Sequence, residues 1–278
     1  MSNNSGHLNF DPSRQDTLKI TSKSTRMIGT VTNFWTEFKV LFLAFLLLVR
    51  NSLPFLLFFQ TVVPLAFVFA MGHYAGYRPA NEQLIHIVAG TITFNLAYLG
   101  LMSVASRLSW MREEGSLLYY CALPINKASF ILALLCSRTL MILPSMIIPI
   151  LGGMLMYNLD LNIELWLPVI IILGTFVLAI IGTTLGVLIK NNELLLVITN
   201  SLIFVMALAS PTFLTAASLP WPLQLLGWLM PTTYISEAIT LSLSGQYGIT
   251  FIVDIAMLIV MGGLGLLFTA KFLEWRNN

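Results

Sequence analysis

Residues 165–189 read LWLPVIIILGTFVLAIIGTTLGVLI, an apolar stretch without a single charged side chain. A helix needs about 20 such residues to cross a hydrocarbon core of roughly 30 Å. Similar stretches recur along the chain, so the sequence predicts an all-α protein that crosses a membrane several times. The stretches that are long enough, or nearly so, are residues 53–71, 84–106, 128–157, 165–189, 194–210 and 249–273.

The composition points to the same class of protein. Hydrophobic residues make up 57% of the chain and charged residues only 9%, whereas a soluble domain carries about 25% charged residues. The net charge of +2 is too small to indicate a nucleic-acid partner. We expect one transmembrane domain over residues 31–278 and a flexible cytoplasmic tail over residues 1–30. That tail lacks the apolar run of roughly 7–15 residues that marks a secretory signal peptide.

Lysine and arginine are distributed unevenly between the loops. Of the 14, Arg78 falls in a loop on one side and Arg138 inside a span, which leaves 12 on the other side. The positive-inside rule therefore predicts that both termini are cytoplasmic and that the number of full spans is even. Together with the apolar stretches this leads us to expect six transmembrane helices, in the plasma (inner) membrane. Arg138 either snorkels to the cytoplasmic interface, pairs with a structural partner or contacts substrate. The outer loops are assigned the acidic residues Glu82, Asp160, Glu164, Glu237 and Asp254.

Residues 31–49, VTNFWTEFKVLFLAFLLLV, precede the first span. Their continuous apolar part, Val40–Val49, would be about 15 Å long as a helix, too short to cross. Arg50-Asn51-Ser52 then interrupts the pattern. This predicts an N-terminal amphipathic helix in the interface that turns into the first span near Ser52. The alternative is one long tilted helix from Val40 to Ala70.

Residues 111–126, MREEGSLLYYCALPIN, follow the second span. An apolar and aromatic segment begins after Glu113 and Glu114 and stops at Pro124, which predicts a short amphipathic helix on the cytoplasmic side. Two carboxylates at its start would suit the helix macrodipole. The segment exceeds the 2–8 residues typical of a tight helix–helix connection. Such a helix either offers a surface to another protein or lies passively on the membrane.

Residues 211–248 are too apolar for an ordinary outer loop and are broken by Pro220, Pro222 and Pro231. The pieces Leu223–Met230 and Thr232–Leu243 would be about 12 Å and 18 Å long, so neither crosses alone. They predict a re-entrant outer helical pair before the last span; a single kinked span, giving seven crossings, is the alternative. The candidate site residues of this outer segment are Trp221, Trp228, Pro231, Tyr234 and Glu237.

In order and character, these three segments resemble the transmembrane subunits of ABC-2-type (type-2) ATP-binding-cassette exporters. That family includes the daunorubicin-exporter, nodulation-factor and O-antigen-exporter permeases, and the resemblance extends from about residue 31 to 273. One departure is that Glu237-Ala238 is followed by Ile239-Thr240, where the family often has a basic residue. The resemblance implies a permease that moves an amphiphilic or hydrophobic substrate (a drug, a lipid or a lipid-linked glycan) out of the cytoplasm or inner leaflet.

The resemblance also implies partners. None of the six lysines follows a glycine, so the chain lacks a phosphate-binding loop, and a separate ATPase subunit, in two copies, would bind ATP and Mg. A second permease copy would complete a homodimer or heterodimer. We expect no cofactor, metal or catalytic residue in this chain. Contact with the ATPase subunit is assigned to Arg112, Glu113, Glu114, Gly115, Leu118 and Pro124.

Two asparagines, three aromatic residues and a methionine inside the second and fifth spans are candidates for a substrate pathway, although packing or lipid-facing roles suit them equally. Small residues in the spans let helices approach closely, notably Gly182 and Gly186, and Gly262, Gly263 and Gly265. A secondary transporter and a non-transporting membrane scaffold remain alternative functions. The pathway candidates are Phe94, Asn95, Tyr98, Asn200, Phe204 and Met206.

Overall fold

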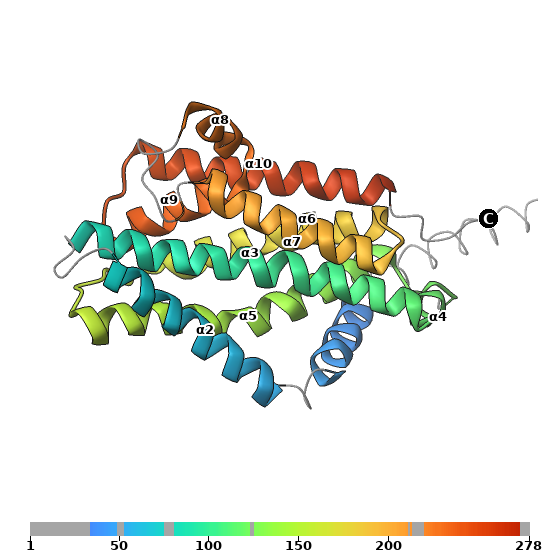
Figure 1. The fold of residues 1–278 in the computed structure, drawn as a ribbon. Coiled ribbons are helices and arrows are strands. Elements are labelled where there is room, and N and C mark those ends of the chain that lie inside the picture. The colour runs from blue at the N-terminus through green and yellow to red at the C-terminus, as the bar shows by residue number, and fades with distance from the viewer. Residues whose placement is uncertain are drawn as a thin grey trace, which may run out of the picture.

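The computed structural model describes residues 34–48, 53–74, 81–122, 125–210, 212 and 220–272, and its regular structure there is entirely helical (Figure 1). The all-α prediction is thus confirmed for these ranges, whereas the predicted tail over residues 1–30 lies outside them. A helix over residues 34–48 comes first. It is followed by α2 (Leu53–Tyr74), α3 (Asn81–Glu113), α4 (Ser116–Ala122), α5 (Lys127–Tyr157), α6 (Trp166–Leu188), α7 (Asn192–Ala209), α8 (Trp221–Leu229), α9 (Pro231–Leu243) and α10 (Ile249–Phe272).

Within the described ranges, five helices are long and apolar enough to cross a membrane: α3, α5, α6, α7 and α10. They correspond to five of the six predicted spans. The remaining predicted span, residues 53–71, falls in α2, which has 22 residues and a described apolar stretch over Thr61–Ala70. The chain is therefore a multi-pass membrane protein, and six crossings remain a prediction.

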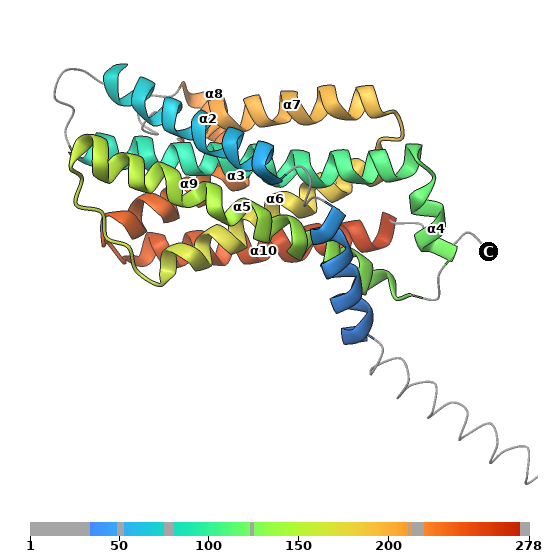
Figure 2. The ribbon, with the colours of Figure 1, turned by 90° about the horizontal axis from the view of Figure 1, so that it is seen from below.

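Helix α3 runs the length of the bundle and packs against α5, α6, α7 and α9 (Figures 1 and 2). Its approach to α6 is close because α6 presents glycine to it. A Cβ at Gly182 would collide with the carbonyl oxygen of Leu101, and one at Gly186 would lie 3.3 Å from that of Ala105. This glycine pair thus serves helix packing within the chain. At the exposed Gly263 of α10, in contrast, an added Cβ would have no neighbouring atom within 4 Å among the residues that the structure describes.

The described chain begins and ends at the same end of the bundle, together with α4 (Figure 1). There the backbone N–H of Asn126 donates to Glu37 Oε2 at 2.9 Å, which ties the first helix to the start of α5. At the opposite end, the loop before α6 meets the end of α9, where the Asn162 N–H donates to the Leu243 carbonyl at 2.9 Å. Chain ends on one side agree with an even number of crossings.

The helix over residues 34–48 crosses the long axis of the bundle steeply and runs in a different direction from α2 (Figures 1 and 2). One straight helix from Val40 to Ala70 does not fit this arrangement. Leu41 and Phe45 are buried against α3 and α5, with the Phe45 ring 5.7 Å from that of Phe130. The packing explains why this short apolar helix is a separate element.

The structure corrects the end of the second span. Helix α3 continues past residue 106 to Glu113, so Glu113 and Glu114 close α3 and do not open the short helix, which begins at Ser116. Their predicted fit to a helix N-terminus is therefore wrong. The reason is Arg112, whose guanidinium donates to the carbonyls of Gly186 at 2.6 Å and Ile189 at 2.9 Å. These bonds hold the last turn of α3 against the end of α6.

The orientation of the bundle can be tested by cysteine labelling. Glu114 and Gln246 are exposed at opposite ends. With Cys121 and Cys136 replaced by serine, Gln246→Cys should react with an impermeant maleimide on intact cells, because the positive-inside rule places that end outside. Glu114→Cys should react only after permeabilisation. Labelling of Glu114→Cys on intact cells would show that the orientation is opposite to the predicted one.

Candidate functional site

A cavity of about 200 Å³ lies over one face of α3, between α2 and α7. We call it the central cavity, since Asn95 and Asn200 lie near the midpoints of their helices. It contains five of the six residues predicted for a pathway. The sixth, Met206, is only 2% exposed and packs in the core. The lining residues are Val63, Pro64, Phe67, Thr91, Phe94, Asn95, Tyr98, Asn200, Ile203 and Phe204.

The central cavity combines apolar walls with a few amide groups. The rings of Phe67 and Phe94 stack at 5.9 Å between α2 and α3. Asn200 donates its Nδ2 to the Leu196 carbonyl at 2.9 Å, whereas the buried Nδ2 of Asn95 has no hydrogen-bond partner among the described residues. A buried amide without a partner costs free energy, so a polar group that enters here is favoured. Phe204, 63% exposed, lies at the mouth.

Helix α4 forms a second candidate surface, at the end of the bundle where the described chain begins and ends. Leu117 and Tyr120 pack inward, and the Tyr120 ring lies 5.4 Å from that of Phe130. Leu118 and Tyr119 point the other way and are 76% and 65% exposed. The short helix is therefore anchored by one face and presents an apolar face to the outside, as a docking helix requires.

The structure divides the residues assigned to ATPase contact. Glu113, Glu114 and Leu118 are exposed on or next to α4. Arg112 is engaged with α6, as described above, so it supports the fold. Gly115 has a φ of 71°, a left-handed conformation that favours glycine and makes the turn from α3 into α4. Pro124 lies outside the described residues.

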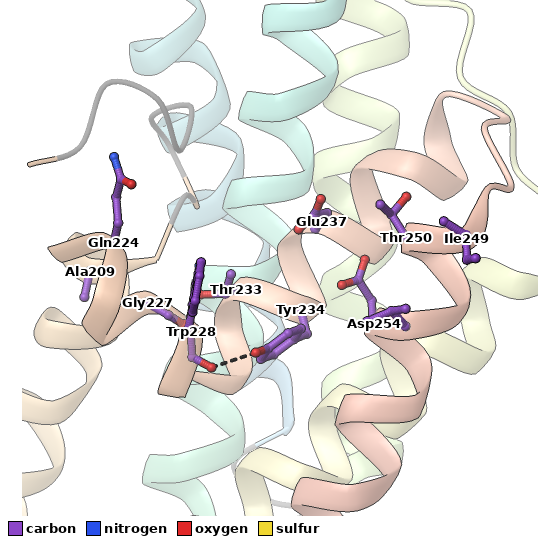
Figure 3. A pocket seen from close by; sticks show the side chains of 11 residues that line it. Ala209, Gln224, Gly227, Trp228, Thr233, Tyr234, Glu237, Ile249, Thr250 and Asp254 are labelled. Carbon is purple, nitrogen blue, oxygen red and sulfur yellow. Dashed lines mark hydrogen bonds between the residues drawn. The ribbon is translucent and has the colours of Figure 1, made fainter. Parts of the chain in front are cut away.

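Helices α8 and α9 confirm two short pieces where the prolines predict them, with bounds within two residues of expectation. They meet at Met230, and Pro231 is the first residue of α9, a favoured position for proline. Two hydrogen bonds fasten the corner. Thr233 Oγ1 donates to the Gly227 carbonyl at 2.6 Å. The Tyr234 hydroxyl donates to the Trp228 carbonyl at 2.7 Å, the bond drawn in Figure 3. Trp221 and Trp228 are both exposed.

A larger cavity of about 350 Å³ lies between α8, α9 and α10 (Figure 3). We call it the outer cavity. Glu237 of α9 lines it, and so does Asp254 of α10. The charge pattern assigns Asp254 to an outer loop, but the structure places it inside α10 with 4% of its surface exposed. A carboxylate five residues into an apolar run was the available signal, because charges within spans are rare and mostly functional.

Two comparisons with known proteins bear on the chain. The model of a protein family described as "ABC-2 type transporter" matches residues 34–244, which is more than half of the chain. The match begins with the first described helix and extends through α9, so it includes the central cavity, α4 and the corner between α8 and α9. Among curated proteins, no match to the chain was found.

Proposed function

Since the chain belongs to the ABC-2 type transporter family, and is therefore a transmembrane subunit of such a transporter, we propose that it exports an amphiphilic or hydrophobic substrate. Hydrophobic drugs, lipids and lipid-linked glycans are the classes in question. The observation that carries this proposal is the central cavity, whose apolar walls and amide groups suit a molecule with both apolar and polar parts.

The position of the central cavity supports a route from the membrane. Phe204 and Val63 lie at its rim and are more than half exposed on the side of α2 and α7, a surface that would face lipid. An amphiphile could therefore enter sideways from the inner leaflet, with its polar group at Asn95 and its chain against Phe94. A hydrophilic ion would find no charged side chain among the described residues that line this cavity.

The partners follow from the same proposal. ABC-2 permease domains generally pair with an ATP-binding-cassette subunit, and the exposed face of α4 is the surface we assign to that contact. Two ATPase copies would supply ATP and Mg, and a second permease copy would complete the pathway. The corner of α8 and α9 would close the outer end of that pathway, with the α4 end in the cytoplasm.

The central cavity can be tested with Asn95→Leu, which keeps the side-chain size but removes the amide. Reconstituted with its ATPase subunit in liposomes, the wild-type permease should move an NBD-labelled lipid or a rhodamine dye in an ATP-dependent manner. Loss of one hydrogen bond costs about 0.5–1.5 kcal/mol, so Asn95→Leu should raise the KM for transport several-fold. Transport rates at rising substrate concentration measure this.

Thr93→Val is the matched control for Asn95→Leu. Thr93 is buried two residues away and does not line the cavity, and its one side-chain hydrogen bond among the described residues is to the Ala89 carbonyl of its own helix. Its replacement should leave the KM unchanged. An equal rise in both variants would indicate a general packing effect. Transport that follows an ion gradient and ignores ATP would contradict the proposal and indicate a secondary transporter.

A further inference from the structure

Asp254 is an unusual residue for its position. It lies in the second turn of α10, a helix apolar enough to cross a membrane, and it is 4% exposed. Its Oδ2 has no hydrogen-bond partner among the described residues. Burial of a carboxylate without a partner is costly, and intramembrane charges commonly mark ligand or ion sites. The carboxylate projects from α10 toward α9, into the outer cavity (Figure 3).

Glu237 adds a second carboxylate to the same cavity. The neighbours of Glu237 on α9, Ile235, Ala238 and Ile239, are buried in the core, which leaves Glu237 on the face that borders the cavity. Glu237 and Asp254 line the same cavity. No lysine or arginine is among the described residues that line the cavity. The outer cavity therefore carries negative charge that the described side chains do not balance.

The other walls of the outer cavity are aromatic and apolar. Trp228, 71% exposed, offers a flat ring at one side, and Ile249 and Val253 line the other. The Tyr234 hydroxyl is engaged with the Trp228 carbonyl, which presents the ring of Tyr234 to the cavity. A volume of about 350 Å³ lies within the range of small-molecule sites. Aromatic rings and carboxylates together suit an organic cation.

We propose that the outer cavity binds the protonated amine of an amphiphilic substrate. Asp254 accepts a hydrogen bond from the ammonium group, Glu237 adds negative charge near the mouth, and Trp228 faces the apolar part of the molecule. The inference rests on the proposed function, because it identifies the exported amphiphile as a cationic amine. A metal ion is less well suited, since the described residues hold no group of three or more His, Cys, Asp or Glu side chains that could bind one.

The test uses the full chain in lipid nanodiscs and two probes that differ in one group. Tritiated naphthylethylamine is cationic at neutral pH, and tritiated naphthylethanol is its neutral counterpart. Binding is measured by scintillation proximity, without the ATPase subunit. The wild-type protein should bind the amine more tightly than the alcohol. Asp254→Asn, which keeps the shape, should weaken amine binding about tenfold to hundredfold, as expected for a hydrogen bond to a charged group, and leave alcohol binding unchanged.

Three further variants separate the roles of the residues. Glu237→Gln should weaken amine binding less than Asp254→Asn, because an exposed charge is screened by solvent. Trp228→Leu should weaken binding of both probes. Asp160→Asn, an exposed carboxylate outside the cavity, should change neither.

Two results would overturn the proposal: undiminished amine binding by Asp254→Asn, or binding of calcium in place of the amine. Since binding is measured without ATP or export, failure here leaves the exporter function standing. Conversely, amine binding by a protein that shows no ATP-driven transport would support the binding site and contradict the exporter function.

Discussion

Replacement of Gly182 by alanine should lower the thermal stability of the purified protein, whereas the same change at Gly263 should not. A methyl group at Gly182 meets the backbone carbonyl of Leu101, which cannot move without displacing α3. Overpacking of this kind costs about 1–3 kcal/mol. An exposed helical Gly263→Ala gains up to about 1 kcal/mol from helix propensity, so the two variants are expected to differ in sign.

The measurement is the apparent Tm of the detergent-solubilised chain, followed by tryptophan fluorescence and by size-exclusion chromatography. Gly182→Leu adds more volume at the same point and should prevent recovery of monodisperse protein. An equal loss of stability in Gly182→Ala and Gly263→Ala would contradict the explanation. It would indicate that an added methyl group at Gly263 also meets a close neighbour, outside its own chain.

Export driven by ATP should fail in Leu118→Asp, although the permease itself should fold normally. Leu118 is 76% exposed in the isolated chain, so a carboxylate there meets water and costs little. In a complex with the ATPase subunit, the same carboxylate would be buried without a partner. Truncation or mismatch of a buried charge at an interface costs 2–5 kcal/mol or more, which weakens binding at least about thirtyfold. Co-purification of the ATPase subunit and ATP-dependent transport measure this directly.

Two comparisons sharpen the interpretation of Leu118→Asp. Leu118→Met keeps the apolar contact and should retain transport. Reversal of both Glu113 and Glu114 to arginine should leave insertion intact but uncouple ATP hydrolysis from export. The same reversal of Glu82 and Asp160, which are exposed at the opposite end, should leave both insertion and coupling intact. Normal export by Leu118→Asp would show that the exposed face of α4 is not the contact with the ATPase.

The helical outline was predictable because the length of an apolar run decides whether a helix can cross a membrane. Most residues that line the central cavity could also be predicted from the sequence. Asn200, Ile203 and Phe204 recur at helical spacing on one face of α7, and Phe94, Asn95 and Tyr98 do so on α3. The same spacing explains why Met206, although a pathway candidate, does not line the cavity. It lies about 200° around α7 from Phe204 and so faces the core.

Contacts between distant segments could not be predicted. Nothing near Arg112 in the sequence reveals that its partners are carbonyls of Gly186 and Ile189, 74 and 77 residues away. The sequence therefore did not show where α3 ends, and Glu113 and Glu114, which close α3, were assigned to the start of the next helix. Asp254 was missed for a related reason. Its burial depends on how α9 packs against α10, which hydropathy alone does not report.

The glycine contacts of α6 and the bonds of Arg112 have a mechanical consequence. They join α3 and α6 at Gly182, at Gly186 and again at their shared end. A force applied to α4 would therefore reach two helices at once, and α3 alone is about 50 Å long. Such a pair resists bending and behaves as a stiff lever. A small tilt imposed by the nucleotide cycle would then appear at the far end as a sideways displacement next to α9.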